Sequence, residues 1–132
     1  MVLCVVDDLI FSVKISTAAK ALGAGVFFER NPGMVLARIR EKQPSLVIFD
    51  LNSAKLRPME AIAAMKADPS LRTVRTLGYV SHVQTDVIAA ARAAGIDEVL
   101  ARSAFSDRLG EILLTPPTTP AGPGRAGSEG QS

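Results

Sequence analysis

The sequence has few of the residue types and none of the long apolar runs that mark several protein classes. Cys4 is the only cysteine of the 132 residues, so an internal disulfide is excluded, and its apolar surroundings predict a buried, unreactive thiol. A single histidine supplies no histidine metal site. No apolar stretch approaches the roughly 18 residues of a membrane span, and no segment resembles a signal peptide. We therefore expect a soluble, cytoplasmic protein without a membrane partner.

An excess of charge is also missing. Lys and Arg number 15 and Asp and Glu number 13, which leaves a net charge of +2. The basic residues are scattered and do not form a stripe, so we do not expect a nucleic-acid partner. The densest basic stretch, residues 38–42, contains Glu41 and predicts the solvated face of a helix.

Short β-rich runs alternate with longer helical patterns from Val2 to about Leu114, which is typical of βαβ units and a parallel sheet. Strands are expected at residues 2–6, 26–29, 46–50, 76–80 and 98–100. Helices are expected at about residues 11–22, 32–42, 58–66, 85–94 and 104–114. The fold class is therefore α/β, with a doubly wound five-stranded parallel sheet of order 2-1-3-4-5.

Several helix boundaries carry their own signals. Asn31 followed by Pro32 reads as an N-cap and a first helical residue, and Pro58 opens a helix in the same way. Gly23 and Gly95 follow alanine-rich runs, where a residue that tolerates positive φ ends a helix at little cost.

The composition changes after residue 114. Residues 115–132 contain four prolines and four glycines and no Val, Ile, Leu or aromatic residue. Such a segment cannot bury enough apolar surface to offset its ordering entropy. We expect one domain over residues 1–114 and a disordered Pro/Gly-rich tail over residues 115–132.

Carboxylates follow two of the predicted strands. Asp7 and Asp8 follow the first strand, and Asp50 ends the third. In the order 2-1-3-4-5 these strands are neighbours, and open α/β sheets bind ligands at the carboxyl ends of their strands. Three close carboxylates repel one another unless a cation lies between them, and Mg²⁺ is the natural occupant.

These features give the chain a resemblance to the receiver domains of bacterial response regulators, which have the flavodoxin-like fold. The resemblance covers residues 2–114. It rests on Asp7-Asp8, on Phe49-Asp50-Leu51-Asn52, on the run 89–95 and on the stretch 99–105.

The resemblance implies roles for the residues at this edge. A histidine kinase or a phosphotransfer protein would phosphorylate Asp50. Asp7, Asp8 and Asp50 would hold magnesium together with the backbone carbonyl of Asn52. A nucleophilic carboxylate and a charge-neutralising cation are what phosphoryl transfer needs.

Two further positions would contact the phosphoryl group. Ser81 is the expected hydroxyl after the fourth strand, although a count back from Gly95 without a gap points to Val80. Arg102 stands where receivers have a lysine, and Ser103 where they have a proline. A guanidinium is planar and prefers bidentate geometry, so we expect this part of the site to differ from that of other receivers.

Three apolar residues, Leu9, Ile10 and Phe11, follow the acidic pair at a turn that receivers fill with polar or small residues. One interpretation is that two of the three pack into the core. The other is a contact surface for a partner or for a second copy of the chain. For Tyr79 we expect a packing role, and for His82 a structural or capping role.

The first hypothesis for function is a stand-alone, atypical receiver in two-component signalling that acts on a downstream protein partner through contacts. In the alternative, a pseudo-receiver, Arg102 clamps Asp50 and the fold serves as an interaction or dimerisation module without phosphorylation. An aspartate-nucleophile phosphohydrolase is disfavoured, because such enzymes need a second Asp where this chain has Asn52. We therefore expect a signalling domain and not an enzyme.

Overall fold

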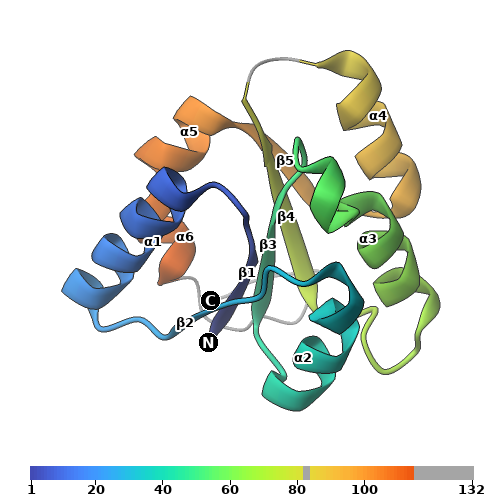
Figure 1. The fold of residues 1–132 in the computed structure, drawn as a ribbon, viewed down its shortest axis with the longest axis horizontal. Helices are drawn as coiled ribbons and strands as arrows, with labels where there is room; N and C mark the ends of the chain where they lie inside the picture. The colour runs from blue at the N-terminus through green and yellow to red at the C-terminus, as the bar shows by residue number, and fades with distance from the viewer. Residues whose placement is uncertain (82–83, 115–132) are drawn as a thin grey trace, which may run out of the picture.

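A computed structural model describes residues 1–81 and 84–114 (Figure 1). The five strands are parallel and form one sheet in the order β2-β1-β3-β4-β5, which confirms the predicted topology. The strands are β1 (Val2–Val5), β2 (Val26–Phe28), β3 (Leu46–Asp50), β4 (Arg75–Val80) and β5 (Glu98–Ala101). Each lies within one or two residues of its predicted range.

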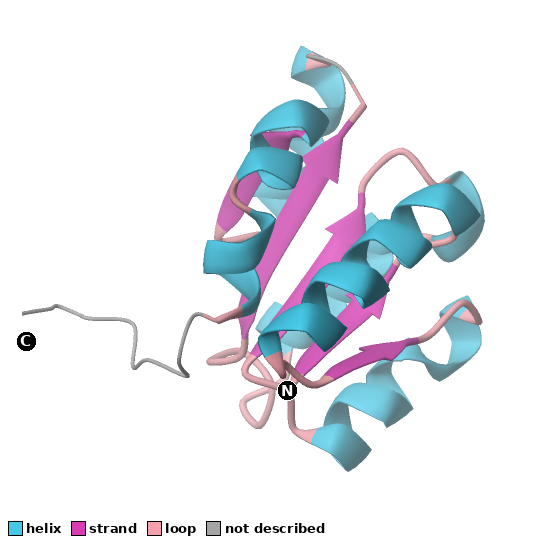
Figure 2. Ribbon diagram, turned by 90° about the vertical axis from the view of Figure 1, so that its left-hand side faces the viewer, coloured by secondary structure: helices cyan, strands magenta, loops and turns pink. Residues whose placement is uncertain are grey.

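Helices cover both faces of the sheet (Figures 1 and 2). One face carries α1 (Leu9–Leu22), α5 (Arg102–Asp107) and α6 (Leu109–Leu113). The other carries α2 (Val35–Lys42), α3 (Pro58–Ala67) and α4 (Thr85–Ala94). Two short 3-10 helices, η1 (Pro32–Met34) and η2 (Ala54–Leu56), precede α2 and α3.

The prediction of a single last helix over residues 104–114 was wrong in two respects. The observed helical segment starts earlier, and it consists of two helices, α5 and α6. It begins at Arg102, directly after β5, and breaks at Arg108. There φ is −99° and ψ is 9°, and the Arg108 guanidinium lies 3.2 Å from carboxylate oxygens of both Glu98 and Glu111. The early start places Arg102 at the carboxyl edge of the sheet.

Short-range signals marked four further boundaries correctly, whereas α1 begins at Leu9, two residues before its predicted start, and residues 32–34 form η1 before α2. Gly23 and Gly95 end α1 and α4 with φ of 69° and 105°. The Asn31 side chain accepts a hydrogen bond from the Gly33 amide at 3.0 Å, as expected of an N-cap. Pro58 is the first residue of α3.

The central strands β1, β3 and β4 are buried on both faces, as parallel sheets between helices require, whereas the edge strands β2 and β5 are partly exposed. In β1, Leu3 and Val5 contribute to the core under α2 and α3, whereas Val2 and Cys4 contribute to the core under α1 and α6. Burial raises the pKa of the Cys4 thiol to about 12. The predicted burial of the thiol is therefore confirmed.

An aromatic cluster fills the core between α1, β4 and α5. The ring of Tyr79 lies 4.9 Å from that of Phe11 and 4.9 Å from that of Phe105, and all three residues are buried. Burial raises the pKa of Tyr79. The predicted packing role of Tyr79 is confirmed. The three rings pack together directly below the carboxyl edge of the sheet.

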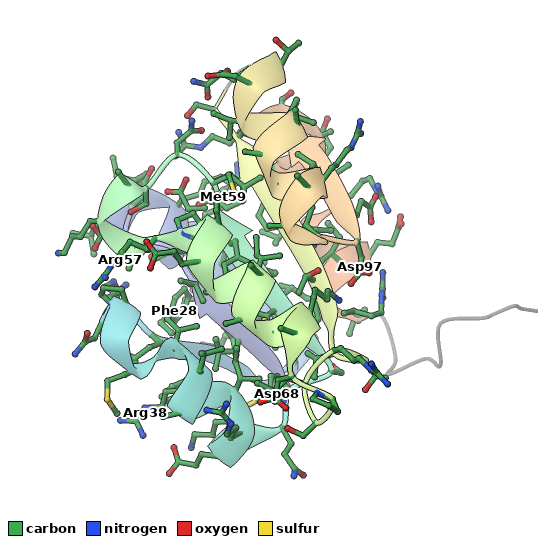
Figure 3. The ribbon with its side chains drawn as sticks, turned by 90° about the vertical axis from the view of Figure 1, so that its right-hand side faces the viewer. Phe28, Arg38, Arg57, Met59, Asp68 and Asp97 are labelled. Carbon is green, nitrogen blue, oxygen red and sulfur yellow. The ribbon has the colours of Figure 1, made fainter. Side chains whose placement is uncertain are left out.

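The basic stretch 38–42 lies on the outer side of α2, where Arg38 is seen in Figure 3. Arg38 pairs with Glu29 at 3.0 Å and with Glu41 at 2.7 Å, and Arg40 pairs with Asp68 at 2.9 Å. These groups neutralise one another, as the prediction of a solvated helix face requires.

The predictions for the tail, residues 115–132, and for His82 lie outside the described residues. In the described part of the chain, no helix combines the length and the apolar character needed to cross a membrane.

Gly78 in β4 leaves no room for a side chain. An added Cβ would lie 2.7 Å from Leu51 Cδ1 and 2.9 Å from Ile96 Cδ1. We expect Gly78→Ala to lower the free energy of unfolding by about 1–3 kcal/mol through overpacking, measured by urea denaturation. Gly110→Ala is the control, because its Cβ would meet Leu22 at an ordinary 3.6 Å. Equal stability of the two variants would contradict this account.

Candidate functional site at the carboxyl edge

The strands all point the same way, so their carboxyl ends lie at one edge of the sheet (Figure 2). Asp50 ends β3 and lies beside Tyr79 of β4. Asp7 and Asp8 follow β1, Ser81 follows β4, and Arg102 follows β5. The structure therefore brings the polar residues singled out in the sequence to the same edge.

Asp50 is half-buried, and the only hydrogen bond of its carboxylate among the described residues comes from a backbone amide. Its Oδ1 accepts a hydrogen bond from the Asn52 amide at 3.0 Å. Burial raises the pKa of Asp50, and the charges of Asp7 and Asp8 act in the same direction. The Asn52 hydrogen bond and the positive charge of Arg102 oppose this shift. None of the ion pairs among the described residues includes Asp50.

Asp8 has the opposite environment, because both of its carboxylate oxygens are engaged. Oδ1 caps α1 by accepting a hydrogen bond from the Phe11 amide at 3.1 Å, and Oδ2 accepts one from Arg102 Nη2. The Phe11 hydrogen bond, together with the charge and hydrogen bond of Arg102, lowers the pKa of Asp8. Asp8 is therefore held in its ionised form.

Arg102 pairs with Asp8 and not with Asp50, the partner that the pseudo-receiver hypothesis assigned to it. Its guanidinium carbon lies 4.7 Å from the centroid of the Phe11 ring, a distance typical of a cation–π contact. Phe11 belongs to α1, whose N-cap is Asp8. The ring and the carboxylate thus attract the guanidinium to the same side of the site, and the expected clamp on Asp50 is absent from this arrangement.

Asp7 is paired with a cation that the sequence reasoning missed. Lys55 Nζ lies 3.8 Å from Asp7 Oδ2, and the Lys55 side chain is 70% exposed. Lys55 lies in η2, a turn that was not predicted. The only signal in the sequence was a basic residue shortly after Asp50.

The side chain of Asn52 bridges two loops at the mouth of the site. Its Oδ1 accepts hydrogen bonds from Ser81 N at 2.6 Å and from Ser81 Oγ at 2.8 Å. Its Nδ2 donates to Oε1 of Gln84, the N-cap residue of α4. Gln84 was also missed. Ser81 is exposed, whereas Val80 is 1% exposed in β4, so the hydroxyl is the group available at this position.

The donor types suit a hard divalent cation, and two of the three carboxylates have cationic side chains as partners in this structure. Within the described ranges, no three His, Cys, Asp or Glu side chains form a group that could hold a metal ion. Asp7 and Asp8 are in ion pairs instead. The predicted magnesium set of Asp7, Asp8 and Asp50 therefore stays a prediction.

Only one of the three apolar residues after Asp8 enters the core. Phe11 is 4% exposed, but Leu9 is 71% and Ile10 is 81% exposed. The expectation that two of the three pack inside was wrong, because the α-helix begins at Leu9 and its first turn directs only Phe11 toward Tyr79 and Phe105. Phe11 therefore does not belong to a contact surface. Val13, on the same helix as Leu9 and Ile10, is 57% exposed. A contact surface at these residues stays a prediction.

The opposite environments of two carboxylates predict opposite effects on stability. Because the folded-state pKa of Asp50 is raised, its charge destabilises the fold at neutral pH, and this cost disappears as the pH falls through that pKa. We expect Asp50→Asn to raise the melting temperature at pH 7, and to do so less at pH 4. Asn retains the acceptor for the Asn52 amide.

Asp68 is the matched control for this measurement. Hydrogen bonds from Ser70, then from Arg40, lower the pKa of Asp68 to about 2. Its stabilising effect is present above the unfolded-state pKa and is lost as the pH falls through the folded-state pKa. Asp68→Asn should therefore lower the melting temperature at pH 7. A decrease for Asp50→Asn as well would contradict the burial argument.

Comparison with known proteins finds similarity to solved structures only. No family model matches the sequence, and no curated protein matches it. A response regulator from Hahella chejuensis superposes with a TM-score of 0.78 at 20% identity, covering 89% of this chain and 96% of its own.

Two other solved structures are similar over most of the chain. The phosphorylated cyanobacterial phytochrome response regulator RcpA superposes with a TM-score of 0.71 at 22% identity, covering 91% of this chain and 97% of its own. The receiver domain of a sensor histidine kinase from Pseudomonas aeruginosa, with magnesium in its active-site cleft, gives 0.74 at 18% identity, with coverages of 85% and 92%. The strand order, the helix arrangement and these superpositions together show that the chain has the flavodoxin-like fold of response-regulator receiver domains.

Proposed function

We propose that the chain is a receiver-type signalling module in which Asp50 accepts a phosphoryl group. The observation that carries the proposal is the state of the Asp50 carboxylate, which is half-buried at the carboxyl edge and takes part in none of the ion pairs among the described residues. A nucleophile must offer an unpaired oxygen to phosphorus, and Asp50 does so while Asp7 and Asp8 are paired.

The proposed transfer uses the chain's own groups. An oxygen of Asp50 forms a bond to phosphorus, the bond between phosphorus and the donor breaks, and its electron pair leaves with the donor. The Ser81 hydroxyl donates a hydrogen bond to Asn52 Oδ1 in this structure. In the proposed transfer it turns and donates that hydrogen bond to a phosphoryl oxygen. Lys55 lies in η2, the segment that follows Asp50, and its ammonium neutralises the negative charge of the new phosphoryl group.

Magnesium is the cation we expect at this edge once the ion pairs of Asp7 and Asp8 open, because hard divalent cations select carboxylate oxygens. One of the similar receiver structures contains magnesium in its active-site cleft. In this chain the expected set is Asp7, Asp8, Asp50 and the Asn52 carbonyl.

The exposed start of α1 suits a protein partner. Leu9, Ile10 and Val13 are exposed apolar residues next to the site, and α1 carries Lys14 and Lys20 but no acidic residue. Two copies would bring like charges together, so a helix with apolar and acidic side chains fits better than a second copy. This supports a histidine kinase or a phosphotransfer protein as the donor and a protein as the downstream partner.

The second candidate is the pseudo-receiver, an interaction module that works without phosphorylation. It is favoured by one observation, the pairing of Arg102 with Asp8, which binds a cationic side chain to a carboxylate that a metal would need. A phosphohydrolase remains disfavoured, because Asn52 holds Ser81 and Gln84 with its amide where that chemistry needs a carboxylic acid.

Incubation with magnesium and acetyl phosphate, followed by intact mass spectrometry, tests the proposal. We expect a gain of one phosphoryl group, lost in Asp50→Asn because the nucleophile is then missing. Asp107→Asn removes an equal charge from an exposed position of α5 and should leave phosphorylation unchanged. Absence of the mass gain in the wild type would favour the pseudo-receiver.

A further inference from the structure

The acidic pair after β1 is already neutralised by the chain itself. Asp8 receives the Arg102 guanidinium, and Asp7 has the Lys55 ammonium at 3.8 Å. The two cations come from different segments, Arg102 from the start of α5 and Lys55 from η2. The pairs therefore connect the loop after β1 with the segments that follow β5 and β3, as a shared metal ion would.

Arg102 is the better held of the two cations. Its side chain is 35% exposed, whereas that of Lys55 is 70% exposed. Its guanidinium lies over the Phe11 ring, and that ring is fixed by Tyr79 and Phe105. An exposed ammonium at 3.8 Å is screened by water and salt, so Arg102 contributes more to the neutralisation than Lys55.

The other oxygen of Asp8 is also engaged, because Oδ1 caps α1 through the Phe11 amide. A carboxylate oxygen can take a second partner beside one hydrogen bond, so the cap alone does not keep a metal ion from Asp8. The positively charged guanidinium on Oδ2 is therefore the group that competes with a metal ion for Asp8.

We propose that Arg102, assisted by Lys55, is a built-in counter-ion that takes the place of the divalent cation at Asp7 and Asp8. The two ion pairs hold the loops of the site in place without metal. A divalent cation binds only in the fraction of molecules in which the Arg102 pair is open, and its apparent affinity is reduced by that fraction. This inference concerns the same site as the proposed function but does not require Asp50 to be phosphorylated.

Binding of Mn²⁺, followed by the loss of its free-ion EPR signal, tests the inference on the full chain. Arg102→Gln removes the guanidinium and should bind Mn²⁺ at least roughly tenfold more tightly than the wild type. Arg92→Gln is the matched control, since Arg92 is an exposed cation in the last turn of α4 and its loss changes the net charge equally. Its affinity should equal that of the wild type. Lys55→Gln should give a smaller gain than Arg102→Gln.

Thermal denaturation supplies a second readout that a merely structural arginine would not move. In buffer with a chelator, Arg102→Gln should melt below the wild type, and Mg²⁺ should restore the loss, while the wild type stays insensitive to Mg²⁺. Equal Mn²⁺ affinity of the wild type and Arg102→Gln, or no binding by either, would overturn the inference. So would a stability loss that Mg²⁺ does not repair. None of these outcomes depends on phosphorylation, which the mass measurement decides separately.

Discussion

The rest of the site depends on the two interactions that the Asp8 carboxylate makes. One oxygen caps α1 and the other binds Arg102. The cap fixes where the helix begins, and this start directs Phe11 inward and leaves Leu9 and Ile10 in solvent. The Phe11 ring then lies below the guanidinium that the second oxygen binds. A single side chain thus sets the helix start, the exposed apolar surface and the position of the cation.

The parts of the fold that could be predicted from the sequence depend on local signals. Short apolar runs predicted the strands. Two glycines with positive φ, Gly23 and Gly95, marked the ends of α1 and α4. The last helix was harder, because nothing local marks Arg102 as a helix start and its N-cap, Ala101, has no capping side chain. The break at Arg108 accompanies a pair with Glu98, a residue on β5 that helical periodicity does not reveal.

The site was predictable as a set of residues but not as a set of partners. Any parallel sheet in this order brings Asp8 and Asp50 to one edge, so the sequence indicates that both acids are near Arg102. Which acid binds the guanidinium is decided by the Phe11 ring, and therefore by the packing of Tyr79 and Phe105 from distant parts of the chain. For the same reason Lys55 and Gln84, which act through tertiary contacts, had no distinctive signal.

The environments of Asp50 and Asp8 shift their pKa values in opposite directions. Burial makes the charge of Asp50 costly, while the helix cap and Arg102 stabilise that of Asp8. Carboxylates whose pKa values are driven in opposite directions by their environments are typical of functional sites. A new group on Asp50 would compete for Ser81, which Asn52 now holds together with Gln84 at the start of α4. The Asn52 amide, two residues after Asp50 in the chain, thus links the end of β4 to the N-cap residue of α4.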